Sequence, residues 1–384
     1  MSAIDELIAE LCPDGVEYRK LGKVANIKRG TRVVKKNLST SEGYPVFQNS
    51  LTPLGYHTDF NEPAGTPFVI CAGAAGEIGY SESEYWAADD CYSIECGEAI
   101  DSKYALHSLL RSQRTLKAQV RKASIPRLSK DVVARLEIPV PPIEVQREIV
   151  RILDSFTELE ADLEAELGAR KAQYSYYRDR LLSLESLEAL DGKPVEMVRL
   201  GDVCVRQKGM PITAAKMKEL ASEAGNVVVF GGGKTKVLAN RDDLPKGNVI
   251  ETPSVVVKSR GNIGFEYCDV PFTNKNELWS YAASSSNVDI KFIYHYLDSR
   301  RAFFQDAAKV GKLPQISTGI TDDFQVSLPS LETQQKIVCI LDRFDALTTS
   351  LTDGLPAEIE ARKAQYGYYR DRLLDFPRKE AAAS

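Results

Sequence analysis

The feature that most constrains this chain of 384 residues is an internal duplication. Residues 169–184 and 361–376 agree at 13 of 16 positions, and both contain Ala-Arg-Lys-Ala-Gln-Tyr-x-Tyr-Tyr-Arg-Asp-Arg-Leu-Leu. Upstream, residues 141–154 resemble residues 329–342, beginning with Pro-x-x-Glu-x-Gln and ending with Ile-Leu-Asp. Between these anchors the two halves differ almost everywhere. A repeat of this length predicts two copies of one structural unit, each with a divergent block and a nearly invariant stretch.

The repeated stretches have the spacing of long amphipathic helices. In both copies apolar residues recur at steps of three and four, at Ile149, Ile152, Phe156, Leu159 and Leu163, and at Ile337, Ile340, Phe344, Leu347 and Leu351. Heptad spacing predicts two helices that pack together as an antiparallel coiled coil, although amphipathic helices within a larger core would show a similar pattern. The second copy has four extra residues, where Asp353-Gly354-Leu355-Pro356 predicts a helix stop and a restart with proline as its first residue.

The predicted fold class is α+β, with two α/β domains joined by the two long helices in a pseudo-two-fold arrangement. Strands are expected at 67–71, 91–94, 132–138, 227–230, 255–257 and 324–328, and further helices at 102–122 and 291–308. The expected parts are a first domain at 1–142, a first helix at 143–185, a linker at 186–195, a second domain at 196–330, a second helix at 331–376 and a tail at 377–384.

Charge is distributed unevenly along the chain. The overall net charge is −5, yet residues 17–142 carry 17 basic and 14 acidic side chains, and residues 196–330 carry 17 and 15. Residues 111–135 hold eight basic residues against Asp131 alone, which is typical either of a phosphate-contacting face or of a solvated helix face.

Composition and the N-terminus favour a cytoplasmic location without a membrane span. No apolar run approaches the ~20 residues that cross a bilayer, and the N-terminus lacks the basic region of a secretory signal. The closest of the seven cysteines are Cys91 and Cys96, which disfavours a disulfide framework or a zinc site.

Motifs for catalysis are not found. Gly233-Lys234-Thr235 has the end of a phosphate-binding loop, but Val228 stands where the first glycine is required. The three histidines, His57, His107 and His295, occur in unrelated contexts, and the latter two lie inside predicted helices, where they are expected to be packed or surface residues rather than a base or a ligand. The sequence therefore favours a binding module without catalytic or metal-ligating residues.

The chain resembles the DNA-specificity subunit of Type I restriction-modification systems. The resemblance rests on the opening Leu11-Cys-Pro-Asp-Gly-Val-Glu-Tyr18, on the helix starts at 141 and 329, and on the paired tyrosine-rich runs. It implies two target-recognition domains, each reading half of a split DNA sequence, with the long helices as a spacer. It also implies a non-catalytic subunit that docks two modification (methyltransferase) subunits and, in the full complex, two restriction (endonuclease and translocase) subunits. S-adenosylmethionine and ATP with Mg²⁺ are then expected on those partners, with no cofactor on this chain.

The resemblance places residues 122–129 and 309–317 in loops at the DNA face. Because Arg, Lys, Asn and Gln are the usual base and phosphate ligands, they dominate the candidate set. The candidates for double-stranded DNA are Arg29, Arg32, Gln48, Asn49, Lys122, Ser124, Arg127, Ser129, Lys130, Lys208, Lys234, Lys236, Arg260, Asn262, Asn274, Lys275, Asn276, Lys312, Gln315 and Ser317.

Partner docking is expected on the repeated surface, because two identical partners need two similar patches. Tyr and Arg are enriched at interface hot spots. The candidates are Tyr176, Tyr177, Arg178, Arg180, Tyr368, Tyr369, Arg370 and Arg372. Two other functions stay open at this point, an antiparallel coiled-coil scaffold whose globular domains bind proteins and a self-contained methyltransferase or nuclease.

Overall fold

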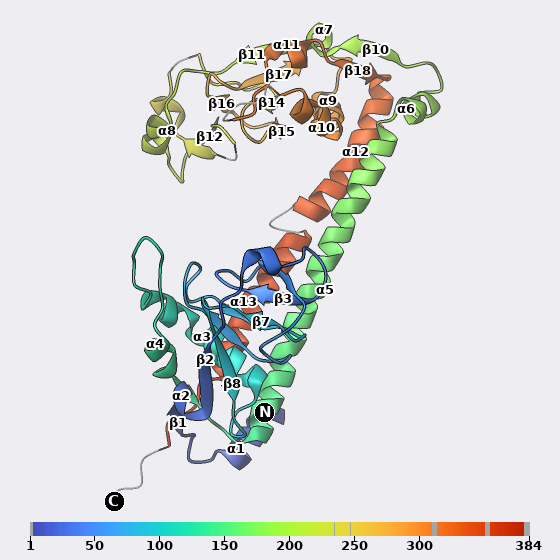
Figure 1. Ribbon diagram of the computed structural model, residues 1–384. Coiled ribbons are helices and arrows are strands. Elements are labelled where there is room, and N and C mark those ends of the chain that lie inside the picture. Colours follow the sequence, from blue (N-terminus) through green and yellow to red (C-terminus); the bar gives the residue numbers. More distant parts are fainter. Residues whose placement is uncertain (1–2, 234, 246, 309–312, 350–353, 380–384) are drawn as a thin grey trace, which may run out of the picture. The chain divides into compact units, whose positions relative to one another are not determined.

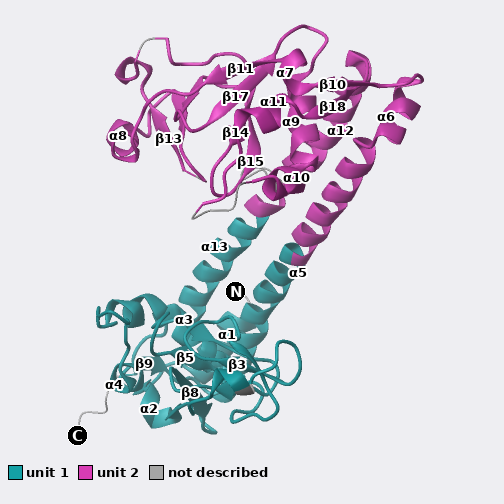
Figure 2. Ribbon diagram, turned by 45° about the horizontal axis from the view of Figure 1, so that its top comes forward, with its two compact units in different colours: residues 1–164, 358–384 teal, residues 165–357 magenta. Residues whose placement is uncertain are grey.

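The computed structural model describes residues 3–233, 235–245, 247–308, 313–349 and 354–379 (Figure 1). The chain divides into two compact units, and each of them is built from parts of both halves of the sequence (Figure 2). Unit 1 comprises residues 1–164 and 358–384, whereas unit 2 comprises residues 165–357. A unit therefore contains one globular part, the beginning of the long helix that follows it, and the final part of the other long helix.

Unit 1 begins with a helix and continues into three small sheets. Its elements are α1 (Ala3–Leu11), β1 (Tyr18–Lys20), α2 (Leu21–Val24), β2 (Ala25–Arg29), β3 (Tyr44–Phe47), β4 (Gly55–His57), β5 (Phe68–Ile70), β6 (Ile78–Gly79), β7 (Trp86–Ala87), β8 (Cys91–Cys96), α3 (Ser102–Ala118), α4 (Lys130–Ala134) and β9 (Glu137–Pro139). The long helix α5 (Ile143–Leu181) follows, and most of α13 (Leu355–Leu373) completes the unit.

Unit 2 repeats this order with two additional helices, at residues 214–220 and 301–306. Its elements are α6 (Leu184–Asp191), β10 (Glu196–Arg199), α7 (Leu200–Val203), β11 (Cys204–Lys208), α8 (Ala214–Leu220), β12 (Val227–Phe230), β13 (Lys236–Ala239), β14 (Ser254–Lys258), β15 (Gly264–Cys268), β16 (Phe272–Asn274), β17 (Trp279–Ala283), α9 (Ile290–Ser299), α10 (Arg301–Asp306), α11 (Thr318–Asp322), β18 (Gln325–Leu328) and α12 (Leu331–Thr349).

The two units share one sheet topology. In unit 1 the strand orders are β2-β8-β5-β6, β4-β3-β7 and β1-β9, and in unit 2 they are β11-β17-β14-β15, β13-β12-β16 and β10-β18. In the three-stranded sheets the middle strand pairs antiparallel with one neighbour and parallel with the other, in both units. The mixed α+β class and the duplicated unit predicted from the sequence are confirmed, because elements of unrelated sequence occupy matching places.

In each unit two long helices run antiparallel. In unit 1 the ring of Phe156 stacks on Tyr369 at 5.3 Å, and Lys363 pairs with Glu160 and Glu164, so the numbers rise along α5 while they fall along α13. In unit 2 Tyr177 of α5 stacks on Phe344 of α12 at 5.9 Å, and further along the chain Ser330 N, just before α12, donates to Asp191 at 3.0 Å, so the numbers again rise on one side while they fall on the other. The antiparallel packing predicted from the heptads is therefore present within each unit.

The buried residues of these helices do not follow the predicted seam throughout. Val145, Ile149 and Leu153 are fully buried in the core of unit 1, and their spacing of four is typical of a helix that packs on a globular domain. Ile340, Leu347 and Leu159 of the predicted seam are exposed by 42%, 39% and 39%, while Leu341 is fully buried in unit 2. The beginning of each helix therefore packs on its own globular part, and Leu351 lies outside the described residues.

Several predicted elements have different bounds in the structure. The strand expected at 132–138 is the helix α4 followed by the short strand β9, because the Ser129 side chain accepts a hydrogen bond from Val132 N and caps α4. The helix expected at 291–308 breaks at Arg300 into α9 and α10, and α6 occupies most of the expected linker. The helix restart near Gly354 is present, although Leu355 rather than Pro356 is its first residue.

None of the helices formed by the described residues combines the length and the apolar character that a membrane span requires. Within the same part of the chain, no group of three or more His, Cys, Asp or Glu side chains is close enough to hold a metal ion.

Candidate nucleic-acid interface

The loop at residues 121–129 of unit 1 is attached to the end of β5 by backbone hydrogen bonds. Gly73 N donates to Pro126 O at 3.2 Å, and Leu128 N donates to Cys71 O at 2.9 Å. The loop closes on itself, because Arg121 and Arg127 exchange both backbone hydrogen bonds, at 2.8 and 3.2 Å. Gly73 has φ +83°, and a side chain there would collide with Asn49. The chain positions Asn49 and Arg127 next to this glycine.

Three arginines surround one cavity beside this loop. A cavity of about 440 Å³ is lined by Arg29, Arg121 and Arg127 together with Gln119, Ser129 and the apolar residues beneath them. All three arginines are exposed, and the guanidinium of Arg29 is oriented by donating to Asp89 O at 2.8 Å. Three guanidinium groups around an open cavity form a site suited to phosphate oxygens or to guanine, both of which accept paired hydrogen bonds.

In unit 2, the described part of the corresponding loop, residues 313–317, is attached in the same way but carries different side chains. Gly261 N donates to Pro314 O at 2.9 Å, and Ile316 N donates to Ser259 O at 3.0 Å, so the bonds of unit 1 recur 188 residues later. The bridge that joins Ala72 to Arg127 in unit 1 joins Arg260 to Gln315 in unit 2. The matched bridge therefore carries one arginine, Arg127, opposite an alanine in unit 1. In unit 2 it carries an arginine opposite a glutamine.

The other candidates for DNA contact are spread over each unit. Arg32, Asn49, Lys122, Ser124, Lys208, Asn262, Asn276 and Ser317 are exposed, and Gln48 is half-buried. Lys236 pairs with Glu266 at 3.0 Å and Lys275 with Glu277 at 2.8 Å, which reduces the charge they offer to a phosphate. Lys234 and Lys312 lie outside the described residues.

Asn274 is the candidate that the structure places least favourably. Its side chain is fully buried, and its amide nitrogen donates to Leu278 O at 2.8 Å. Asn274 is the last residue of β16, and its side chain closes the turn that follows, so a direct base contact would require this end of the strand to open. The residue type alone could not distinguish a base contact from a turn that closes on itself.

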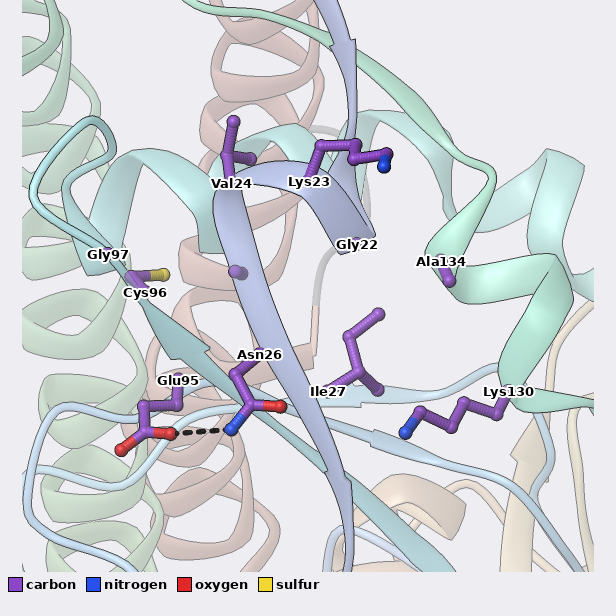
Figure 3. Close-up of a pocket in the computed structure, with 11 residues that line it drawn as sticks. Gly22, Lys23, Val24, Asn26, Ile27, Glu95, Cys96, Gly97, Lys130 and Ala134 are labelled. Atoms are coloured by element: carbon purple, nitrogen blue, oxygen red, sulfur yellow. Dashed lines mark hydrogen bonds between the residues drawn. The ribbon is translucent and has the colours of Figure 1, made fainter.

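Lys130 does not join the arginines of the loop. It lines a separate cavity of about 620 Å³ between β2 and α4, where Lys23 and Glu95 are also found (Figure 3). In Figure 3 Asn26 of β2 is bonded to Glu95 at 2.9 Å, and Glu95 also pairs with Lys28. The acidic partner makes this cavity less attractive to phosphate than the arginine-lined one.

The candidate docking residues fall into two groups. Tyr176 and Tyr368 are exposed by 60% and 61%, and each forms an edge-on pair with the next tyrosine, at 5.4 and 5.3 Å. Arg180 and Arg372 are also exposed. Arg178 and Arg370 instead lie over the rings of Tyr174 and Tyr366, with side chains exposed by 13% and 18%. These two arginines are therefore largely covered by their neighbours, and their part in partner docking stays a prediction.

Two residues of interest were absent from the sequence-based set. Arg121 lines the arginine cavity, and the basic run at 111–135 was the signal that could have found it. Lys258 ends an apolar strand and is buried, with its ammonium 4.5 Å from the ring of Phe230 and 3.5 Å from Glu266. Burial lowers the pKa of Lys258, and Glu266 opposes that effect. Nothing in the sequence distinguishes this lysine from an exposed strand residue.

Comparison with known proteins agrees with this duplicated arrangement. Residues 13–169 and 192–361 match the family described as "Type I restriction modification DNA specificity domain". The chain is 30% identical to the Escherichia coli "Type I restriction enzyme EcoR124I/EcoR124II specificity subunit", covering 100% of this chain and 99% of the relative. It is 28% identical to "Putative type I specificity subunit S.MpnORF507P" of Mycoplasma pneumoniae, over 93% of this chain and 97% of that protein.

A solved structure shares the fold. The S subunit of a type I restriction-modification system from M. genitalium aligns with a TM-score of 0.63 and 19% identity, over 94% of this chain and 96% of that chain. Both halves of the sequence are matched by the same family, and the overall match spans the whole chain. The protein therefore belongs to the type I restriction-modification family of DNA specificity subunits.

Proposed function

We propose that this chain reads a bipartite DNA target, with one half-site for each unit, and that it presents methyltransferase subunits to the bound DNA. The observation that carries the proposal is the repeated loop, which keeps its two backbone bonds to the segment after the central strand in both units while its outward side chains differ. A reader of two different half-sites needs one scaffold and two different sets of base contacts. The chain itself contributes recognition and no catalytic step.

The side chains at the matched positions favour different bases. Arg127 can donate two hydrogen bonds to O6 and N7 of guanine, and Gln315 can bond to N6 and N7 of adenine. Arg29 and Arg121 lie beside Arg127 and would neutralise neighbouring phosphates. Phosphate contacts would position the unit on the duplex, while the paired hydrogen bonds would select the sequence.

Docking of the partner subunits is assigned to two equivalent surfaces on the long helices. One consists of Tyr176, Tyr177 and Arg180, and the other of Tyr368, Tyr369 and Arg372. Two equal surfaces would accept two copies of one methyltransferase subunit, and aromatic and arginine side chains are frequent anchors of protein interfaces. A solved relative concerns "complex assembly" of "the type I R-M system", which supports an assembly of this kind. Restriction subunits would join in the full complex.

Cofactors are assigned to the partners. The methyltransferase subunits would hold S-adenosylmethionine, and the restriction subunits would hold ATP with Mg²⁺. Such an assembly acts on chromosomal and incoming DNA, so we place it in the cytoplasm.

The test exchanges the two matched side chains. The full chain is produced with its cognate modification subunit in a host without other adenine methyltransferases, and N6-methyladenine is mapped by sequencing. We expect a split motif in the wild type, with Arg127→Gln changing only one half and Gln315→Arg only the other. A motif that depends on neither residue, or that changes in both halves, contradicts the assignment. No methylation with the intact complex would favour the protein-binding scaffold instead.

A further inference from the structure

Four polar side chains, hydrogen-bonded in series through a buried histidine, tie three elements of unit 1 together. Tyr366 Oη of α13 lies 2.9 Å from Nδ1 of His107 in α3, and Nε2 of His107 lies 3.1 Å from Oδ1 of Asp154 in α5. The second oxygen of Asp154 accepts from Lys103 Nζ at 2.8 Å. The exposed fraction of His107 is 2%. The globular part, the helix that leaves it and the end of the other long helix therefore meet at one histidine.

The same four residue types meet in unit 2. Tyr174 Oη of α5 lies 3.3 Å from Nδ1 of His295 in α9, and Nε2 of His295 lies 3.3 Å from Oδ1 of Asp342 in α12. Lys291 Nζ completes the chain at 2.8 Å from Oδ2 of Asp342. His295 is fully buried. The sequence around both histidines differs between the copies, yet this set is complete in each.

The chemistry of the four groups gives each series of hydrogen bonds a direction. An ionised carboxylate only accepts, so the histidine must donate from Nε2 to the aspartate, which leaves Nδ1 as the acceptor of the tyrosine hydroxyl. Burial lowers the pKa of His107 and of His295, with the aspartates opposing the effect, so the neutral rings needed for this order are favoured. One arrangement of hydrogen atoms is consistent with all three hydrogen bonds. A directional series of bonds through a buried histidine is more selective for one geometry than apolar packing alone.

A second repeated anchor lies at the start of each long helix. The side chain of Gln146 is fully buried, accepts from Asp101 N at 2.9 Å, and donates to Ala99 O at 3.0 Å and to Pro141 O at 2.8 Å. Gln334 makes the same three bonds to Asp289 N, Asn287 O and Pro329 O, at 2.8, 3.0 and 2.8 Å. Each globular part is therefore fastened to its helices at two points, about two turns of helix apart.

We propose that the Lys, His, Asp and Tyr side chains of each unit form a joint that fixes the orientation of that recognition domain on the long helices. The joint thereby sets which spacing between half-sites is accepted. The joint of unit 1 is Lys103, His107, Asp154 and Tyr366, and the joint of unit 2 is Lys291, His295, Asp342 and Tyr174. These are positioning residues, since none of them is assigned a contact with DNA. The proposal rests on the proposed function.

The geometry of DNA explains why orientation matters for spacing. One added base pair moves a half-site by about 3.4 Å along the axis and turns it by roughly 35°. A recognition domain held rigidly on its helices cannot follow that rotation, whereas a loosened one can. Loss of a joint is therefore expected to widen the range of accepted spacings while the bases read within each half-site stay the same.

The test uses Tyr366→Phe and Tyr174→Phe, which remove only a hydroxyl group, and His107→Ala as a stronger change. Each full chain is produced with its cognate modification subunit, and methylated adenines are mapped as for the wild type. We expect the fraction of methylated sites with a spacing one base pair longer or shorter to rise about threefold to tenfold, in line with one hydrogen bond. Both half-site sequences are expected to stay unchanged.

The matched control is Tyr85→Phe. Tyr85 is fully buried in unit 1, and its hydroxyl donates to Thr66 O at 3.0 Å, away from the joint. If the control broadens the spacing as much as Tyr366→Phe, the effect is general destabilisation and the proposal fails. Unchanged spacing in both tyrosine variants also overturns it. Absence of a split motif in the wild type would instead contradict the proposed function, so the two failures are distinguishable.

Discussion

Units 1 and 2 agree where the globular part meets the long helices and differ where the loops face outward. The hydrogen bonds of the two joints and of the two buried glutamines recur one for one, although the hydrogen bonds of His107 are shorter than those of His295. Unit 2 adds an ion pair of 2.8 Å between Arg178 and Asp298, whereas unit 1 pairs Arg111 with Asp375 at 2.8 Å. Buried polar groups tolerate little change, because each lost partner leaves another group unsatisfied. Exposed loop residues have no such constraint.

The largest effect is expected at the glutamines. Gln146→Leu leaves one backbone N–H and two carbonyl groups without their partner, which is expected to reduce the free energy of unfolding by about 3–5 kcal/mol. Gln334→Leu should cost the same amount. Each unit contains one tryptophan, Trp86 or Trp279, so urea unfolding can be followed separately in chains that retain only one of them.

The matched control for this pair is Gln335→Leu, since Gln335 is the exposed neighbour of Gln334 on α12 and should change stability by less than ~0.5 kcal/mol. A loss confined to one unit would show that the two anchors are not equivalent, and losses as small as that of the control would show that the anchor bonds contribute little to stability.

The histidines predict a dependence on pH. Burial lowers the pKa of both in the folded chain, so below pH ~6.5 the unfolded state takes up protons first. The stabilising contribution is thus present above that pH and is lost as the pH falls, by at most about 1.4 kcal/mol per pH unit for each histidine. We expect the loss of stability between pH 7.5 and 5.5 to shrink when His107→Gln and His295→Gln are combined. An unchanged slope would mean that other groups cause it.

The smallest effect is expected at the caps of α3 and α9. Asp101 Oδ1 accepts from Lys103 N and Tyr104 N at 2.9 and 3.1 Å, and Asp289 Oδ1 accepts from Lys291 N and Phe292 N at 2.8 and 3.3 Å. Asp101→Ala and Asp289→Ala should each cost about 1 kcal/mol, while the asparagine variants retain most of the cap. Urea unfolding with the unit-specific tryptophans measures both, and losses that differ by more than ~1 kcal/mol would separate the two units at this position.

The sequence predicted the duplicated unit, the long helices and the membership of the family. It also predicted both central strands of the four-stranded sheet in unit 1, but only β14 of the two in unit 2, because it did not identify β17. These features come from local periodicity and from direct repetition, which need no knowledge of distant contacts. Its candidate set included Arg127 and Gln315, although only the structure shows that they occupy matching positions. It gave no sign that the side chains of Asn274, Arg178 and Arg370 are largely covered, because burial of a polar side chain depends on the tertiary packing around it.

By itself, the sequence determined that two copies of one fold alternate with two amphipathic helices, since hydrophobic spacing and repeated motifs are properties of neighbouring residues. Only the tertiary structure decided that each unit borrows the end of the other copy's helix, so that Tyr366 completes the environment of His107 across 259 positions and Tyr174 that of His295 across 121. The physical reason is that hydrogen bonds between buried side chains depend on distances of a few ångströms, and these arise only when segments distant in sequence pack together.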